Sequence, residues 1–593
     1  MYVKKIIYAV CVALCLVGYS FRSEAQNTSN KGKDFWLGYG NHVRGFPSNN
    51  PNSPQNTQQM AVYITSDVNT KGNVEIPGLG TVIPFTVTAN AITTVAIPQG
   101  AYLGDDGKYN TGIHITSEKA VVVYAHIYNM SISGATLVLP TTTLGKDYVS
   151  INYTQISNEI NSYSYFFIVA VEDNTEVDIT PSADTKGGWL ANTIHHITLN
   201  KGEVYQVLGK LLINTSNDSR GSDLTGSKIH SVSTTNQTCK RIAVFSGSGK
   251  IQIGTTPGNR TADNLYQQVY PTAAWGKKFV TAPLKSRNYD IFRIVKSDPS
   301  AIVTLNGVTL TAANFSNGYY EFSSQQPNVI EGDKPIQVVQ YAVTQNNGIN
   351  GTLATEPYGD PEMIFLNPIE QTLTSITMYS TNEYQILAHF VNVIILTQDV
   401  ASFKIDNVSK ASDFKPVPGL PEYSYAQISV SQGTHNLGAT GGFNAIAYGF
   451  GIFESYGYSA GANVKSLSIE AISKSSNQVV VDGCVSEPFN FRITLGYKTS
   501  KISWNLGNGS PVIEELNPTP DNTYIKDGST YYVYKLNQDI IYSIAKDYTI
   551  EVTAENSSGD CGSTELITSD FSIYNQPVAK FTVVSEALSL IHI

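Results

Sequence analysis

Charged residues, long apolar runs and helical periodicity are all scarce in this chain of 593 residues. Only 15% of the residues are charged and the net charge is −10, so the clustered Lys and Arg of a nucleic-acid groove are missing. After residue 25 no stretch is apolar enough to span a membrane, and none has the i, i+3, i+4 spacing of an amphipathic helix. These absences exclude a nucleic-acid partner, a transmembrane segment and a mainly helical fold.

Residues that favour strands and turns dominate instead. The chain has 36 Tyr, more than its 22 Phe, 4 Trp and 5 Met together. Tyr, Thr, Val and Ile favour strands, whereas Asn, Gly and Ser favour the turns between them. A chain of this length is also too long for one core. We therefore predict an all-β protein of several domains.

Residues 1–25 have the pattern of a secretory signal peptide. Lys4 and Lys5 precede an apolar run at 6–21, and Ser-Glu-Ala at 23–25 is a small-residue cleavage site before Gln26. The apolar run is short for a membrane anchor. We therefore expect an exported protein that begins at Gln26.

The region 26–461 contains internal repeats. Aligning Pro140 with Pro271 also aligns Gly145 with Gly276, and a fainter echo surrounds Pro368. Each copy follows an apolar run headed by Lys, and these runs lie at 119–126, 240–247 and 334–341. Such self-similarity predicts a repeated structural unit. We expect about four units, each of five to seven short strands, and in the first unit 113–116 and 120–126 are expected to be two of them.

The size of these units predicts β-sandwiches. Each would span roughly 90–130 residues, whereas a propeller blade has four strands in about 40–50 residues. The fold class is therefore tandem β-sandwich-like repeat units, with a β-propeller as the alternative.

Several ordered motifs resemble one known family. They are DFWLGYG (34–40), GIHITSEKAVVVYAH (112–126), TLVLPTTTLGKDYV (136–149), DLTGSKIHS (223–231), CKRIAVFSGS (239–248), NLYQQVYPTAAWGKKFV (264–280) and AYGFGIFESYGYSAG (447–461). Together they resemble the N-terminal domain of the IgGFc-binding protein family, in the form that secreted proteins of Bacteroidota-type bacteria carry. The resemblance implies an extracellular, adhesive protein that is not an enzyme.

A separate module is predicted at 464–576. The sequence ISWNLGNGS (502–510) resembles the W-x-F-G-D-G turn of PKD-like immunoglobulin-type domains, and 548–562 resembles their last strands. We expect an Ig-like, PKD-like β-sandwich there. Residues 577–587 resemble the truncated start of a further PKD-like domain, and 588–593 resemble a non-native tail.

Three cysteines remain after the signal peptide. Cys484 and Cys561 fall near an early strand and the last turn of the C-terminal module, so we predict a disulfide between them. Cys239 has no obvious mate, and we expect a buried or edge thiol. The adjacent His195 and His196 lie in a predicted strand and point to opposite faces, so they cannot share a metal. No metal, cofactor or catalytic group is predicted.

The functional hypothesis is a secreted or cell-surface adhesin. It would contact a glycoprotein or polysaccharide, or surface proteins of the same cell, through loops on a rigid scaffold. The candidate loops are 45–59, 156–162, 254–264 and 411–421, whereas Trp36 and Trp275 are expected in the core. Two alternatives stay open, a structural component of an extracellular matrix or gliding apparatus and, less favoured, a polysaccharide-active enzyme.

Overall fold

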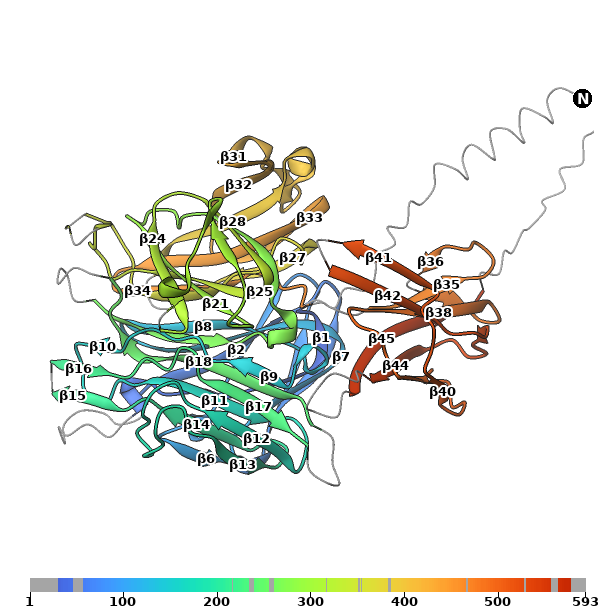
Figure 1. Cartoon of the computed structure of the whole chain (residues 1–593), viewed down its shortest axis with the longest axis horizontal. Coiled ribbons are helices and arrows are strands. Elements are labelled where there is room, and N and C mark those ends of the chain that lie inside the picture. The colour runs from blue at the N-terminus through green and yellow to red at the C-terminus, as the bar shows by residue number, and fades with distance from the viewer. Residues whose placement is uncertain are drawn as a thin grey trace, which may run out of the picture. The chain divides into compact units, whose positions relative to one another are not determined.

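A computed structural model describes residues 30–45, 57–215, 217–233, 239–254, 261–315, 317–349, 352, 355–381, 386–464, 468–480, 482–526, 529–555 and 564–576. The predicted signal peptide and the segments 577–587 and 588–593 lie outside these residues. Strands dominate the chain, which confirms the all-β prediction (Figure 1). The described chain divides into two compact units, Asn27–Ser466 and one that begins at Leu467. Short 3-10 turns connect many strands, namely η1 (Val43–Gly45), η2 (Pro77–Leu79), η3 (Gln99–Ala101), η4 (Thr141–Thr143), η5 (Thr272–Ala274), η6 (Ala312–Phe315), η8 (Thr397–Ser402) and η9 (Ala411–Asp413).

The strands of the larger unit form four groups, which we call repeats 1 to 4. Repeat 1 contains β1 (Gly32–Leu37), β2 (Gln59–Thr65), β3 (Thr70–Ile76), β4 (Thr81–Val87), β5 (Ile92–Ala96), β7 (Ile113–Asn129) and β8 (Ile132–Val138). Repeat 2 contains β9 (Asp147–Val149), β11 (Ser164–Ala170), β12 (Thr175–Thr180), β13 (His195–Leu199), β14 (Val204–Leu208), β17 (Lys228–Val232), β18 (Ile242–Ile251) and β19 (Asp263–Gln268). It also carries β10 (Ile156–Ser157), β15 (Leu211–Thr215) and β16 (Asp218–Gly221), while β6 (Gly107–Tyr109) pairs with β14.

Repeats 3 and 4 follow in the same strand order. Repeat 3 contains β20 (Gly276–Thr281), β21 (Asp290–Lys296), β22 (Val303–Leu305), β23 (Val308–Thr309), β24 (Tyr319–Ser324), β25 (Asn328–Ala342) and β26 (Glu362–Phe365). Repeat 4 contains β27 (Leu373–Ser380), β28 (Ile386–Leu396), β29 (Lys404–Ile405), β30 (Val408–Ser409), β31 (Lys415–Val417), β32 (Leu420–Val430), β33 (Gly433–Gly451) and β34 (Glu454–Ser459).

All four repeats share one topology, organised around a long strand. In repeat 1 the first half of β7 pairs with β1 and β3, and the second half pairs with β2 and β8. The strands β25 and β33 are the corresponding long strands of repeats 3 and 4. In repeat 2 two separate strands, β17 and β18, occupy the position of the long strand. Each repeat therefore has two sheets that share one strand, or one strand position, as the sandwich prediction requires.

The long strand corrects one detail of the sequence interpretation. Residues 113–116 and 120–126 were expected to be two strands, but β7 runs through both. The pairing of β1 with β7 shifts register between Gly32 and Asp34, so β7 passes from one sheet to the other at this bulge. Glu118 and Lys119 are exposed at this crossing, and their polarity suggested a loop.

The four repeats close into a ring. The innermost strand of each repeat packs against the next, β8 on β19, β19 on β26, β26 on β34, and β34 back on β8. The ends of the ring meet where the Asn30 amide donates to the Ala462 carbonyl at 3.0 Å. Sandwich units are thus arranged around an axis as propeller blades are, so the two predicted architectures describe different levels of one fold.

The repeated Pro and Gly motif forms the junctions of this ring. A Cβ added to Gly32 would lie 2.3 Å from Pro140 Cβ, and the same holds for Gly145 with Pro271 at 2.4 Å and Gly276 with Pro368 at 2.2 Å. Repeats 1 to 3 therefore each place a glycine against a proline of the following repeat, whereas Leu373 takes this position in repeat 4. Only a residue without a side chain permits this approach.

The C-terminal unit is a β-sandwich with its own core. One sheet contains β35 (Ser468–Ser473), β36 (Val479–Val480), β38 (Pro488–Leu495), β41 (Asn522–Lys526), β42 (Ser529–Lys535) and β43 (Ile540–Ile541). The other contains β37 (Asp482–Cys484), β39 (Lys501–Asn505), β40 (Ile513–Leu516), β44 (Asp547–Glu555) and β45 (Thr564–Tyr574). Trp504 is fully buried in this core beside the glycine turn that the sequence singled out.

Candidate functional site

The bases of three of the four predicted binding loops meet on one face of the ring. Glu159, in the loop 156–162, pairs with Arg44 at the end of η1 and with Lys250 on β18, the latter at 3.0 Å. The Gln252 amide donates to the Ile156 carbonyl at 2.8 Å. The bases of the loops 45–59, 156–162 and 254–264 are therefore tied together, while 46–56 and 255–260 lie outside the described residues. We call this surface the loop face.

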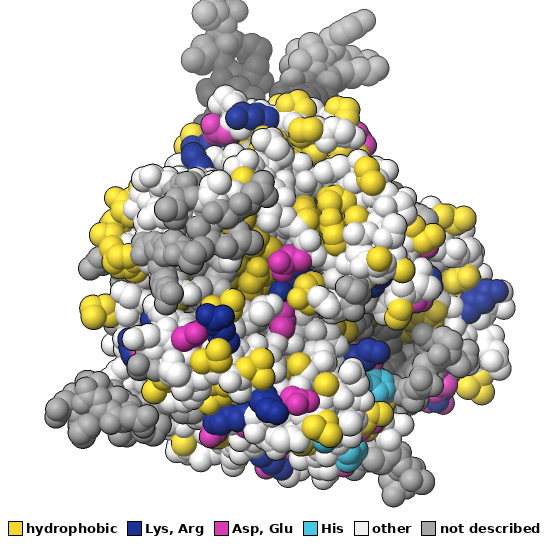
Figure 2. All heavy atoms as spheres, turned by 60° about the vertical axis from the view of Figure 1, so that its left-hand side comes forward, with side chains coloured by type: hydrophobic (Ala, Val, Ile, Leu, Met, Phe, Trp, Pro, Cys, Tyr) yellow, Lys and Arg dark blue, Asp and Glu magenta, His cyan; other side chains and the backbone are white. Residues whose placement is uncertain are grey.

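The hairpin of β15 and β16 extends the loop face. Asn161 donates its amide to Asn214 Oδ1 at 2.9 Å, which joins the hairpin to the loop 156–162. Leu212 is 77% exposed at the start of this hairpin. Figure 2 turns this side of the ring forward and shows acidic and basic side chains next to one another near its middle, among hydrophobic ones. Such a mixed surface suits a partner that offers both polar and apolar contacts.

The fourth predicted loop, 411–421, lies elsewhere. It forms η9, β31 and the start of β32, at the top of Figure 1 and away from β10 and β16 on the left. Phe414 anchors it through an edge-to-face contact with Phe403 at 5.3 Å. The structure therefore separates this loop from the other three.

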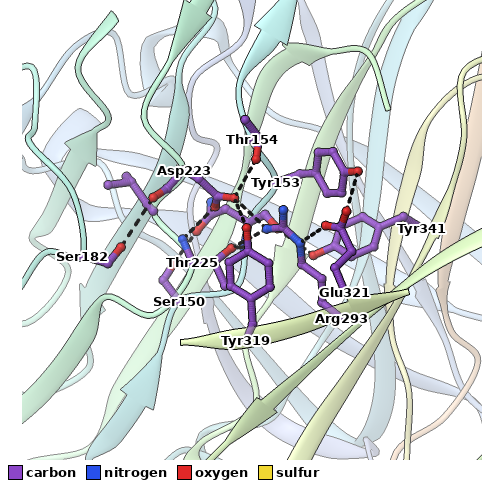
Figure 3. A network of polar contacts seen from close by, with 12 residues as sticks. Ser150, Tyr153, Thr154, Ser182, Asp223, Thr225, Arg293, Tyr319, Glu321 and Tyr341 are labelled. Atoms are coloured by element: carbon purple, nitrogen blue, oxygen red, sulfur yellow. Dashed lines mark hydrogen bonds and ion pairs between the residues drawn. The ribbon is translucent and has the colours of Figure 1, made fainter. Parts of the chain in front are cut away.

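A buried charged network joins repeats 2 and 3 (Figure 3). Arg293 on β21 donates from Nε to Glu321 Oε2 and from Nη1 to Asp223 Oδ2, both at 2.8 Å. Its Nη1 also donates to the Asn152 carbonyl at 2.9 Å and to Thr225 Oγ1 at 2.8 Å. Asp223, Asn152 and Thr225 belong to repeat 2, so Arg293 acts as a clamp between two repeats.

Three tyrosine rings enclose the same guanidinium. The guanidinium carbon Cζ of Arg293 lies 4.0 Å from the ring centroid of Tyr319, 4.3 Å from that of Tyr153 and 5.8 Å from that of Tyr341. Stacked rings add cation–π attraction and hold the planar fork in place. This cage leaves Arg293 only 1% exposed, so the network is built for rigidity rather than for capturing a ligand.

The protonation of the network follows from its pairing. Burial opposes ionisation of Asp223, but the Arg293 guanidinium and the hydrogen bonds from Thr225 hold its pKa below the usual value. Arg293 keeps its charge, since Asp223 and Glu321 outweigh the burial and raise its pKa further. Arg293 and Asp223 therefore form an ionised pair at the centre of the network.

Arg293 is a residue that the sequence interpretation missed. The four repeats can be aligned on the residue of the long strand that pairs with the start of each repeat's first strand. In this alignment Tyr63, Phe167 and Asn392 occupy the position that Arg293 has in repeat 3. A single Arg in the apolar run IFRIV (291–295) was the available signal, because an inward-pointing charge requires partners.

The predicted core tryptophans are buried as expected. Trp36 is 2% exposed and stacks on His114 at 4.2 Å, and Trp275 is 4% exposed and donates to the Tyr270 carbonyl. His195 stacks on Trp189, whereas His196 bonds Asp178 and Glu176, so the two histidines serve different contacts.

The cysteine predictions require correction. Cys484 is a half-buried free thiol, so the disulfide predicted between Cys484 and Cys561 is not formed. Cys239 was expected to be unpaired, yet it is disulfide-bonded, with a partner outside the described residues. Three cysteines allow three pairings, and the choice depends on which segments the tertiary structure brings together. Sequence spacing does not carry that information.

Two features of the described ranges bear on the site. Within them no group of three or more His, Cys, Asp or Glu side chains is arranged to hold a metal ion. Nor is any helix there both long and apolar enough to cross a membrane.

The fold and the loop face define a class of protein, a multi-repeat β scaffold that presents loops from one face. Comparison with known proteins identifies the family. The family model described as IgGFc binding protein matches residues 134–449, more than half of the chain. The chain belongs to this family.

A curated human protein is also similar to part of this chain. The IgGFc-binding protein of Homo sapiens is 23% identical over 366 residues, which cover 60% of this chain and 6% of the human protein. The chain therefore spans only a small part of the length of that relative.

Proposed function

We propose that this protein is a secreted or cell-surface adhesin whose loop face binds an extracellular glycoprotein or polysaccharide. The convergence of three loops on Glu159 carries the proposal, because a binding site needs several loops held together by a rigid scaffold. The family name and the human relative support a role in protein binding. The Fc ligand in that name belongs to the relative. The C-terminal sandwich, and any PKD-like module after it, would serve as a spacer.

The test is binding of the purified chain to immobilised mucin, IgG Fc and a glycan array. Saturable binding by the unaltered chain is expected. Glu159→Ala should weaken it, because Arg44 and Lys250 then lose their shared partner. The matched control is Asp413→Ala in η9, which alters the separate loop 411–421 and should leave binding unchanged. Equal effects of both variants, or no saturable binding, would refute the loop face as the site.

A structural role is the second candidate, and one observation favours it. The strand β41 is at the edge of its sheet, and Tyr524 and Ile525 on it are 40% and 75% exposed. An exposed edge strand can pair with a strand of another chain. Concentration-dependent assembly in sedimentation, lost in Ile525→Lys, would support this role. A monomer at all concentrations would contradict it.

The remaining alternative is that the protein is a polysaccharide-active enzyme. It is tested by measuring the release of sugar from the same glycan array.

A further inference from the structure

The axis of the ring contains a cluster of buried carboxyl groups. Three of the four innermost strands begin with an acidic residue, namely Asp263 in β19, Glu362 in β26 and Glu454 in β34, whereas β8 begins with Ile132. Asp360 lies two residues before Glu362. None of the four acidic residues is more than 2% exposed. We call Asp263, Asp360, Glu362 and Glu454 the axial carboxyls.

Two serines connect these carboxyls across three strands. Ser133 of β8 donates its amide to Asp263 Oδ1 and its hydroxyl to Glu454 Oε2, the latter at 2.7 Å. Ser455 of β34 donates its amide and hydroxyl to Asp263 Oδ2 at 3.1 and 2.9 Å. Since one serine serves both Asp263 and Glu454, their carboxyl groups lie next to each other at the point where the ring closes.

Several axial oxygens have no hydrogen-bond partner among the described residues. They are both carboxyl oxygens of Asp360, Oε1 of Glu454 and Oε2 of Glu362. A buried carboxylate without a partner is costly, and two adjacent carboxylates repel each other. The cluster therefore needs a neutralising charge or protons.

The neighbouring basic groups are already engaged. Lys250 and Arg287 act on Asp360, but Lys250 pairs with Glu159 at 3.0 Å and Arg287 pairs with Glu356 at 2.9 Å. The remaining titratable neighbours are uncharged. Burial lowers the pKa of His42, beside β8, to about 3 and raises that of Tyr165, near Glu362, far above its usual value. The described residues offer no metal-holding arrangement, so protons are the means of neutralisation that these residues leave.

The titration of the cluster agrees with this geometry. Burial raises the pKa of Asp360 to about 7 and, together with the charge of Asp360, raises that of Glu454 to about 8. Burial also raises the pKa of Asp263 and of Glu362 well above the usual values, with Glu454 and Asp360 adding repulsion at Asp263.

We propose that protonated axial carboxyls hold the four-repeat ring closed, so that the ring is firm in acid and loosens as the pH rises. Below about pH 4 these groups are protonated in both the folded and the unfolded chain. Between there and about pH 8 the folded chain holds protons that the unfolded chain has released. Stability is then lost progressively as the pH rises toward 8.

The test is the thermal unfolding of the full chain at pH 5, 6, 7 and 8. The melting temperature of the ring is expected to fall by roughly 3–6 °C from pH 5 to pH 8. In the double variant Asp360→Asn with Glu454→Gln the amides stay uncharged at every pH, so the slope should fall by roughly half, and Asp263 and Glu362 account for the remainder. The matched control removes two exposed carboxylates, Glu172→Gln with Glu422→Gln, and should keep the slope of the unaltered chain.

Each outcome decides the proposal. A flat profile in the unaltered chain, or an unchanged slope in the axial double variant, would overturn it. Should the double variant fail to fold, Glu454→Gln alone should reduce the slope by roughly a quarter, since it removes one of the four axial carboxyls. Calcium should not alter the profile, and calcium that restores stability at pH 8 would show a cation site instead. The readout is stability rather than ligand binding, so the result is independent of the proposed function.

Discussion

Arg293 and the axial carboxyls are both buried ionisable groups between repeats, but their surroundings differ. Arg293 has two carboxylates, two oxygen acceptors and three tyrosine rings around it. Asp360, by contrast, has no hydrogen-bond partner for either oxygen among the described residues. A buried charge is tolerated when it is paired and is otherwise removed by a shift in protonation. One ring thus contains both solutions.

The largest expected effect comes from breaking the paired cluster. Arg293→Met should lower the free energy of unfolding of the ring by about 3–5 kcal/mol, because Asp223 and Glu321 lose their counter-charge. Arg293→Lys keeps the charge but loses the planar fork and should cost less. Denaturant unfolding measures both. A loss in Arg293→Met below about 1 kcal/mol would show that the network is not a clamp.

Removing the carboxylates as well should restore part of this loss. The triple variant Arg293→Met, Asp223→Asn, Glu321→Gln leaves no uncompensated charge, so it should recover about 2 kcal/mol relative to Arg293→Met. The same unfolding measurement gives the coupling free energy between Arg293 and the two carboxylates. A triple variant less stable than the single one would mean that the hydrogen bonds, and not the charges, matter most.

A steric change separates packing from charge. Gly145→Ala places a methyl group 2.4 Å from Pro271 Cβ and should cost about 1–3 kcal/mol at every pH. Gly438→Ala is the control, because the nearest atom to its added methyl is 3.9 Å away. If Gly145→Ala behaved like Gly438→Ala, the junction between repeats 2 and 3 would be looser than the contact indicates.

The two clusters should respond to single neutralisations with opposite sign. Asp223→Asn should lower the melting temperature at pH 7. This difference should shrink as the pH falls below about 4, where the unfolded carboxyl takes up a proton, and vanish below the lowered pKa of the folded carboxyl. Glu454→Gln should instead raise it by roughly 2 °C at pH 8 and have little effect at pH 5. Shifts of the same sign would contradict the comparison.

The smallest effect concerns Cys484, which provides an internal reference in the C-terminal unit. Maleimide should label this half-buried thiol slowly in the native chain and fully on unfolding, whereas Cys239 should react only after reduction. Arg293→Met should leave native labelling of Cys484 unchanged if it alters the ring alone. Protection of Cys484 from maleimide in the unfolded, unreduced chain would mean that it is disulfide-bonded.

The sequence by itself determined the all-β class, the short strands and the repeated motif. These features are local, since strand propensity, alternation and turn residues are properties of neighbouring positions. The Pro and Gly echoes were visible for the same reason, and burial of Trp36 and Trp275 followed from motifs that contain them.

Only the tertiary structure decided how these parts meet. Closure of the ring, the clamp at Arg293 and the convergence of the loops on Glu159 join residues more than 50 positions apart in the chain. The unpaired state of Cys484 and the bonded state of Cys239 likewise depend on long-range contacts. Of the four innermost strands, only β8 begins without an acidic residue. No local pattern in the sequence shows that the carboxyl groups at the starts of the other three strands meet at the axis of the ring. Contacts between distant residues depend on the path of the whole chain, and that path was not readable from spacing alone.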